Sequence, residues 1–393
     1  MSLGTSKNKA DTKSSRFYFR ILVFFYCFCF YLINIFRRRK PSENPKSFLI
    51  AHHLLLGDTL MLTPMLAKLR YFYPDAIIYF LTSDQYVDLY EKSPYKITAI
   101  GYNPKNFNSY LKLRKIIKSV DIAYIPGDNR FSSLSYSLNA KWIVAFYDRT
   151  ENWLKNIFVD EFVPIPDEPI KWEDMNLQLI KTNQNQADYD GFYNKKDWLS
   201  PAFEPYKRPD CYIILHVGAS NPLRYWPSEN WFELAVNIEN LGYQVIWTAS
   251  PQERNLIENI DPQNRFLAYA NLSLTQLWDL VDHAKLVVCP DTGVSHLAKL
   301  TDTPVIVLFG QGSDILFGKG RFYKNHVFYK AIIIEDFPCR DQNLLFKRHI
   351  TWVRRCNRTT SQCNDNLCMK GISVSEVFDN VLDFTNQYND IRE

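Results

Sequence analysis

The chain has 393 residues, of which 46% are apolar, 15% aromatic and 22% charged. This composition supports a large core and excludes a disordered, collagen-like or disulfide-stapled small protein. The net charge of +4 is uneven, because residues 1–40 carry nine Lys and Arg against one acid and the remainder is mildly acidic. Such a body gives no electrostatic case for nucleic acid, whereas the basic leader suits an anionic membrane surface.

The leader contains a mainly apolar run over residues 17–36, half of it aromatic, followed directly by Arg37, Arg38, Arg39 and Lys40. A membrane-spanning helix needs about 20 apolar residues, and the uninterrupted part of the run, residues 21–33, is shorter. No small-residue cleavage site follows it, so we expect an uncleaved anchor helix that keeps the protein on a membrane. A spanning helix, a helix in the plane of the interface and a removed signal peptide all remain open. Basic residues at both ends leave the orientation undecided.

Strands and helices alternate along the body of the chain. The first half begins with a predicted strand at 48–51, a helix that ends at the Pro74 turn and a strand at 76–81, which together form a β-α-β unit. Further strands are predicted at 97–100, 121–125 and 142–146, with a helix at 107–118. A Pro-, Asn- and Lys-rich stretch at 164–209 is the expected linker, with helical pieces possible near 172–182.

The second half repeats the alternation with clearer boundaries. We predict strands at 212–217, 243–248, 266–269, 286–289 and 305–309, and helices at 228–240, 251–259, 273–283 and 294–300. Alternation of this kind indicates parallel sheets, so we expect an α/β protein with two doubly wound Rossmann-like domains that face a cleft. The predicted boundaries are 1–46 for the leader, 47–190 and 191–370 for the two domains, and 371–393 for a C-terminal helix.

Gly57 and Asp58 stand where the first strand gives way to a helix. In one interpretation, glycine makes the turn and aspartate caps the helix, with no further function. In the other, a carboxylate at the carboxyl end of a strand points into the cleft and removes a proton from an alcohol.

Two later strand ends carry groups suited to an anion. Gly218, Ser220 and Arg224 follow one strand, and glycine allows close approach while arginine offers a planar fork to phosphate oxygens. The alternative is a surface loop with a Trp-Pro packing corner.

The second strand end reads Asp291-Thr292-Gly293-Val294-Ser295-His296 and opens a helix, whose N-terminus attracts anions such as a pyrophosphate. The alternative is that Asp291 only caps the helix and that His296 makes its hydrogen bonds within the protein, without a ligand. Glu253 follows another strand and would either reach a ribose hydroxyl or complement the positive end of a helix.

The sequence lacks the motifs of several other enzyme classes. The sequence contains neither G-x-G-x-x-G nor G-x-x-x-x-G-K-[ST], so a nicotinamide enzyme or a P-loop NTPase is not supported. It contains no G-x-S-x-G and no H-E-x-x-H. A late group of cysteines without C-x-x-C pairs leaves free thiols, a disulfide or a zinc site open; these are Cys339, Cys356, Cys363 and Cys368.

Taken in order, three segments resemble the motifs of glycosyltransferase family 9, the ADP-heptose:lipopolysaccharide heptosyltransferases. They are LLLGDTLMLTPML at 54–66, HVGAS with RYWPSENW between 216 and 231, and PDTGVSHLAKLTDTPVIVLFG at 290–310. Cys368-Met369 with Ile372 and Val377 is similar to the family's carboxyl-terminal end, so the resemblance covers roughly residues 47–380.

The resemblance implies a GT-B fold and an inverting, metal-independent transfer of a sugar, ADP-heptose being the expected donor, onto a lipopolysaccharide core or related lipid-linked saccharide. It implies Asp58 as general base and no cofactor. Ser220, Arg224, Thr292 and Gly293 would hold the diphosphate, Asp291 and His296 would order that loop, and Glu253 would meet the ribose.

The chain departs from the family pattern at several positions. His52 replaces the usual Lys or Arg, and with Gly57 it is expected to contact the acceptor or a phosphate. Arg224 replaces the usual Lys, and Gln311 replaces the proline that follows Gly310. The expected place is the cytoplasmic face of the bacterial inner membrane. A catalytically silent GT-B scaffold on the membrane and a nucleotide-sugar epimerase are the alternative functions.

Overall fold

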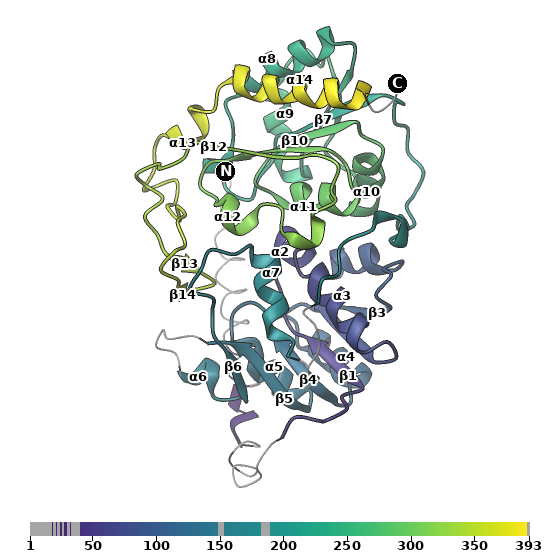
Figure 1. Cartoon of the computed structure of the whole chain (residues 1–393), viewed down its shortest axis with the longest axis vertical. Coiled ribbons are helices and arrows are strands. Elements are labelled where there is room, and N and C mark those ends of the chain that lie inside the picture. The colour runs from purple at the N-terminus through teal and green to yellow at the C-terminus, as the bar shows by residue number, and fades with distance from the viewer. Residues whose placement is uncertain are drawn as a thin grey trace, which may run out of the picture.

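The structure, a computed structural model of the chain, describes residues 40–147, 153–181 and 189–390, with side chains to residue 387. It also describes eight positions of the leader, which are Tyr18, Ile21, Phe24, Phe25, Cys27, Phe28, Cys29 and Leu32. Figure 1 shows two lobes, one above the other, each built around its own sheet.

The N-terminal lobe contains a six-stranded parallel sheet in the order β3-β2-β1-β4-β5-β6. Its strands are β1 Ser47–Ile50, β2 Ile77–Thr82, β3 Ile97–Gly101, β4 Val120–Ile125, β5 Ala140–Phe146 and β6 Glu161–Val163. Its helices are α2 Leu56–Leu60, α3 Thr63–Phe72, the 3₁₀ helix η1 Asp84–Tyr90, α4 Phe107–Ile116, α5 Phe131–Ser137 and α6 Trp153–Asn156.

The C-terminal lobe repeats this arrangement with the parallel order β12-β11-β10-β7-β8-β9. Its strands are β7 Tyr212–His216, β8 Gln244–Thr248, β9 Leu267–Tyr269, β10 Leu286–Pro290, β11 Val305–Phe309 and β12 Tyr329–Ile333. Its helical elements are η4 Pro222–Arg224, α8 Ser228–Asn240, η5 Pro251–Glu253, α9 Arg254–Ile260, α10 Leu274–Asp282, α11 Gly293–Leu300, α12 Asp314–Phe317 and η6 Arg321–Tyr323.

Both sheets have the doubly wound order, in which the direction of strand addition reverses once. The reversal falls between β1 and β4 in the first sheet and between β7 and β10 in the second. Ligands of doubly wound proteins bind in the crevice outside the carboxyl ends of the strands at such a point. The segments after β1, β7 and β10 are three of the four that the sequence analysis singled out, the fourth being the one after β8 that carries Glu253.

The expected alternation of parallel strands and helices is confirmed, with two local differences. The helix expected after Gly57 is two helices, α2 and α3, because Pro64 in the first turn of α3 lacks the N–H that would continue a single helix. Four elements that we did not predict complete the N-terminal lobe, namely η1, α5, α6 and β6, and the unpredicted strand β12 completes the second sheet.

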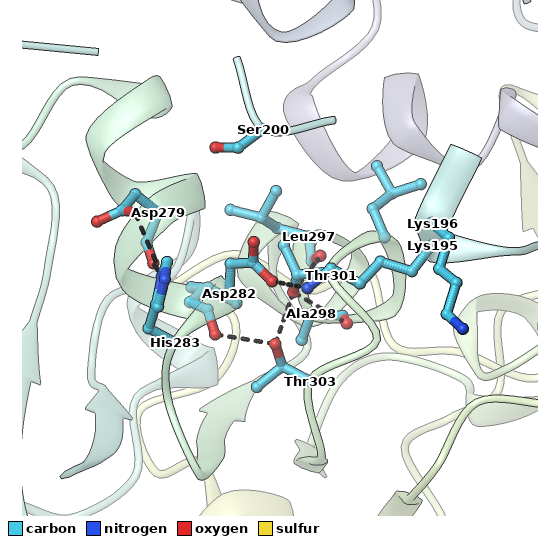
Figure 2. Close-up of polar contacts among 12 residues, drawn as sticks. Lys195, Lys196, Ser200, Asp279, Asp282, His283, Leu297, Ala298, Thr301 and Thr303 are labelled. Atoms are coloured by element: carbon cyan, nitrogen blue, oxygen red, sulfur yellow. Dashed lines mark hydrogen bonds and ion pairs between the residues drawn. The ribbon is translucent and has the colours of Figure 1, made fainter. Parts of the chain in front are cut away.

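The linker contains α7 Trp172–Met175 and two 3₁₀ helices, η2 Asn176–Leu179 and η3 Lys195–Asp197. At its start, the buried carboxylate of Glu173 on α7 pairs with the buried Lys299 ammonium on α11 at 2.7 Å. At its end, Figure 2 shows Lys195 pointing to Asp282 on α10, with which it forms an ion pair. The linker is therefore anchored to the C-terminal lobe by charged groups at both ends.

A long excursion, residues 334–366 between β12 and α13 Leu367–Lys370, is called the strap below. It contains the short antiparallel pair β13 Leu344–Leu345 and β14 Arg348–His349. Figure 1 shows this pair lying on the left, below the upper sheet and close to the lower lobe. Arg348 donates 2.6 Å hydrogen bonds to the Gly127 carbonyl and to Asn129 Oδ1, and Trp352 Nε1 donates to the Pro166 carbonyl. The strap therefore joins the two lobes.

The last helix, α14 Val374–Asp390, lies across the top of the C-terminal lobe in Figure 1 and packs against α8. Most of the expected anchor, residues 17–36, lies outside the described residues, so the anchor stays a prediction. Within the described residues, no helix is both long and apolar enough to cross a membrane. Of the described leader residues, Cys27 is buried against the Ser133 carbonyl, to which its thiol donates at 3.2 Å.

Candidate active site

The two lobes meet at two glycines, Gly57 at the start of α2 and Gly293 at the start of α11. A Cβ on Gly57 would lie 2.8 Å from His296 Cδ2 and 3.4 Å from the Gly293 Cα. A Cβ on Gly293 would lie 3.0 Å from Leu56 Cδ2. The absence of a side chain on both residues lets the first turns of α2 and α11 touch across the lobes.

A cavity of about 850 Å³ opens beside this contact, and both lobes line it. Among its lining residues are most of the side chains predicted from the sequence: Gly57, Asp58, Ser220, Arg224, Glu253, Asp291, Thr292, Gly293 and His296. The structure thus brings a carboxylate of the N-terminal lobe and the groups predicted to hold an anion to one cavity. It does not test the chemical roles of these residues, which stay predictions.

Asp58 lies in the first turn of α2 and is half-buried. Loss of hydration on burial, helped by the nearby Asp291 carboxylate, raises the pKa of Asp58 to about 6, although Arg355 and Arg224 act in the opposite direction. A carboxylate with a pKa in this range is ionised near neutral pH and is a stronger base than an exposed aspartate.

Asp291 and Arg224 line the cavity from the C-terminal lobe. Arg224 Nη1 donates to the Asp291 carbonyl at 2.7 Å and lies 3.5 Å from Asp291 Oδ2. Burial nonetheless raises the pKa of Asp291, because loss of hydration outweighs the attraction of Arg224. The Arg224 Nε is buried and has no hydrogen-bond partner among the described residues. The guanidinium therefore retains donor capacity for a further acceptor.

Thr292 is the N-cap of α11, and its Oγ1 accepts a hydrogen bond from the Val294 N–H at 3.3 Å. The positive end of this eight-residue helix faces the cavity. His296, one turn along α11, is buried beside Gly57, and burial lowers its pKa well below the usual value. A neutral imidazole that packs across the lobe contact fits the predicted ordering role.

The carboxylate of Glu253 stabilises the loop that follows β7 through hydrogen bonds. Its carboxylate accepts hydrogen bonds from the Ala219 N–H at 2.8 Å, from the Tyr225 hydroxyl at 3.1 Å and from Ser250 Oγ at 2.5 Å. A Cβ on Gly218 would lie 2.5 Å from Glu253 Oε2, so a side chain at this position would displace the Glu253 carboxylate. These contacts show how Glu253 holds the loop, and its contact with a ribose stays a prediction.

His52 does not belong to the group of cavity-lining residues. It is fully buried, and its ring packs against Phe80 with centroids 4.7 Å apart. Burial, with a smaller contribution from His53, lowers the pKa of His52 to about 3, so the imidazole is neutral. The expected contact of this residue with an acceptor or phosphate is therefore not supported by its position, because a side chain that follows β1 directly remains in the core.

Arg355 lines the cavity and was not predicted. It lies on the strap, far in sequence from the three strand-end motifs, and follows no strand of either main sheet. Its sequence context, ITWVRRCNR at 350–358, matches none of the motifs that indicated the other site residues. Only the folding of the strap against both lobes brings Arg355 to the cavity.

Neither a disulfide nor a metal cluster is formed by the late cysteines in the described part of the chain. Cys339, Cys356, Cys363 and Cys368 are all free thiols. Among the described residues, no group of three or more His, Cys, Asp or Glu is arranged to hold a metal ion. Of the alternatives left open by the sequence, free thiols match the structure.

Comparison with known proteins identifies the family. The profile of glycosyltransferase family 9 (heptosyltransferase) matches residues 145–347, which is more than half of the chain. The lipopolysaccharide heptosyltransferase 3 of Escherichia coli K12 is 21% identical over 277 residues, covering 65% of this chain and 79% of the relative. The lipopolysaccharide core heptosyltransferase OpsX of Haemophilus influenzae is 24% identical over 286 residues, covering 68% and 80%.

Solved structures share the fold. A family 9 glycosyl transferase from Veillonella parvula superposes with a TM-score of 0.66 at 16% identity, covering 87% of this chain and 98% of its own. The E. coli ADP-heptose lipopolysaccharide heptosyltransferase II gives 0.62 at 17% identity, covering 88% and 99%.

The protein thus has the two-lobed α/β architecture of the GT-B type, with two parallel sheets that face one cavity. Specifically, the chain belongs to glycosyltransferase family 9 and is a glycosyltransferase. Family membership favours this enzyme class over the silent scaffold and the nucleotide-sugar epimerase.

The contact between α2 and α11 predicts a specific coupling between Gly57 and His296. We expect Gly57→Ala to lower the thermal unfolding midpoint, because the added Cβ collides with the His296 ring. In a His296→Ala background the same change should cost less, with a coupling of about 0.5–3 kcal/mol for residues in contact. Thermal denaturation of the four proteins measures this coupling. Equal costs in both backgrounds would contradict the predicted contact.

Proposed function

We propose that the protein transfers heptose from ADP-heptose, with inversion, onto a lipopolysaccharide core or a related lipid-linked saccharide. The relatives support the sugar, since they are named lipopolysaccharide heptosyltransferases. One structural neighbour with TM-score 0.60, at 17% identity, is the E. coli heptosyltransferase WaaC with ADP. The observation that carries the proposal is the placement of Asp58, with its raised pKa, on the same cavity as Arg224 and the N-terminus of α11.

The reaction requires one proton transfer and one displacement. An acceptor hydroxyl oxygen attacks the anomeric carbon from the face opposite the diphosphate, and the bond from that carbon to the diphosphate oxygen breaks. Asp58 takes the hydroxyl proton as the new glycosidic bond forms, which is general base catalysis. The products are the glycosylated acceptor, a protonated Asp58 and ADP.

The leaving diphosphate gains negative charge as this bond breaks. Arg224 would contact it with the donors that its bond to Asp291 leaves available, and the Thr292-Gly293 turn would present the positive end of α11. Ser220, which is exposed at the end of the β7 loop, would add a hydroxyl donor. These groups supply the charge stabilisation that a metal gives in other glycosyltransferases, and we propose that the reaction needs no metal.

The remaining groups would define the two ends of the cavity. Glu253 would meet the donor ribose from the β8 side, while Asp291 and His296 hold the α11 turn in place. The acceptor would enter along the N-terminal lobe, where η1 contributes Tyr86 to the lining. A carboxylate between donor and acceptor then faces both substrates.

Replacing Asp58 with Asn tests the general base. We expect turnover with ADP-heptose and a heptose-accepting lipopolysaccharide core to fall by about 10²–10⁴, the usual contribution of a positioned base. The affinity for ADP should not fall, because the Asp58 carboxylate has no proton to donate to the diphosphate. Transfer assays and isothermal titration measure the two quantities, and wild-type turnover in the variant would remove Asp58 from this role.

The wild-type pH profile provides a second test of the same residue. A base works only when deprotonated, so kcat/KM should fall as the pH drops through about 6, the raised pKa of Asp58. An ordinary aspartate would keep activity down to about pH 4. An acid limb at pH 4 with an otherwise active enzyme would show that Asp58 is not the base or is not buried in the working enzyme.

We also propose that the enzyme works at the cytoplasmic face of the bacterial inner membrane, anchored by residues 17–36. Its expected donor is made in the cytosol and its expected acceptor is lipid-linked. The leader supplies both aromatic and basic residues, which suit an anionic membrane interface.

Vesicle binding tests the electrostatic part of this anchoring. We expect replacement of Arg37, Arg38, Arg39 and Lys40 by Gln to weaken binding to phosphatidylglycerol-rich vesicles, by about 1 kcal/mol for each basic residue near the surface. Binding to neutral phosphatidylcholine vesicles should change much less. Co-sedimentation at two salt concentrations measures both, and an unchanged affinity for anionic vesicles would contradict the proposed basic anchor.

A further inference from the structure

We infer that Arg355 of the strap is a second cationic ligand of the donor diphosphate, acting with Arg224 on the leaving group. This inference rests on the proposed function. It adds a residue that lies outside the recognised motifs and comes from a segment that belongs to neither sheet.

Hydrogen bonds of its own N–H and carbonyl groups fix the backbone of Arg355. Its N–H donates to the Gln342 carbonyl at 3.2 Å, and the Gln342 N–H donates to the Arg355 carbonyl at 3.0 Å, which forms an isolated antiparallel bridge. The next residue, Cys356, donates its N–H to the Gln311 carbonyl at 3.0 Å. The strap therefore holds Arg355 rigidly where it enters the cavity.

Gln311 also connects Arg355 to Arg224. Its side-chain amide donates to the Arg358 carbonyl on the strap at 3.1 Å and accepts from Asn221 Nδ2 at 2.9 Å. Asn221 is the N-cap of η4, the turn that carries Arg224. One side chain thus sets the position of the two segments that carry the arginines.

The guanidinium of Arg355 has no acceptor in the described protein. Its Nε is buried without a hydrogen-bond partner, and the group lies over the Phe317 ring, 5.5 Å from the centroid. No described carboxylate lies within ion-pair distance of it. A largely buried guanidinium without hydrogen bonds is costly unless a ligand supplies the acceptors.

Two cations, Arg355 and Arg224, face the same cavity from different segments. Loss of hydration on burial lowers the pKa of Arg355 and the nearby Arg224 lowers it further, while Asp291 and Asp58 act in the opposite direction. A diphosphate placed between the two arginines relieves their repulsion and satisfies their free donors.

Arg355 is attracted by both carboxylates of the cavity, Asp291 and Asp58. Of the two arginines, Arg355 has the larger effect on the pKa of Asp58, whereas Arg224 has the larger effect on that of Asp291. In an inverting displacement the base and the leaving phosphate lie on opposite faces of the anomeric carbon. Arg355 and Arg224 would therefore act together on the diphosphate, where negative charge grows in the transition state, and Arg355 also favours the ionised form of Asp58.

Arg355→Gln, with Arg354→Gln as a matched control, tests this assignment in the full-length protein. Arg354 is the exposed neighbour, whose guanidinium donates to carbonyls of the strap itself. Isothermal titration with ADP and with AMP should show a loss of about tenfold or more for ADP in Arg355→Gln and a much smaller loss for AMP, since AMP lacks the second phosphate. Arg354→Gln should bind both as the wild type does.

Kinetics separates contact with the leaving group from a structural role of the strap. Arg355→Gln should lower kcat as well as kcat/KM, and Arg355→Lys should recover part of the loss. Its acid limb in kcat/KM should move to higher pH, because removing a cation raises the pKa of Asp58, which is then faced by Asp291, Tyr86 and Arg224. A purely structural role would not move that limb.

The outcomes distinguish this inference from the proposed function. Equal loss of ADP and AMP affinity, or wild-type ADP affinity and kcat in Arg355→Gln, would overturn the role of Arg355 while heptose transfer by the wild type stands. A selective loss for ADP in a protein that transfers no heptose would support the diphosphate contact and reject the proposed donor.

Discussion

The contact of two glycines, Gly57 on α2 and Gly293 on α11, determines how the two lobes face each other. Both helices begin at a reversal point of their sheet, and both point their first turn at the other lobe. Without side chains at these positions, the N-terminus of one helix reaches the N-terminus of the other. The cavity beside this contact therefore receives a carboxylate from one lobe and an anion-attracting helix end from the other.

The approach of α2 to α11 also brings two carboxylates and two arginines into one cavity. Burial raises the pKa of both Asp58 and Asp291, and Asp291 raises that of Asp58 further, while Arg224 and Arg355 act in the opposite direction on both carboxyls and repel each other. Such a set of groups is poised for a substrate that brings negative charge to the arginines and a proton to Asp58. A nucleotide diphosphate with an acceptor hydroxyl meets both requirements, which is why the electrostatics support glycosyl transfer.

The sequence predicted the parts of the site that follow from strand order. Asp291 follows β10 directly, while Asp58, Ser220 and Arg224 lie in the turns that follow β1 and β7, and parallel strands bring their carboxyl ends to one edge. Arg355 could not be predicted in this way, because the strap has no periodicity and reaches the cavity only through tertiary contacts such as those of Gln311 and Arg348. His52 lies closer to the end of β1 than Asp58 does, yet it is buried against Phe80 and does not line the cavity, so its contact with an acceptor or phosphate stays a prediction.

A crystal structure of the full-length enzyme with ADP-2-deoxy-2-fluoro-heptose tests the central claim most directly, because it locates the anomeric carbon relative to both lobes. The account predicts a diphosphate held at the N-terminus of α11 beside Arg224, and an anomeric carbon whose open face is turned toward the Asp58 carboxylate. A donor bound with its anomeric carbon turned away from Asp58, or a diphosphate held outside the cavity beside Gly57 and Gly293, would contradict it.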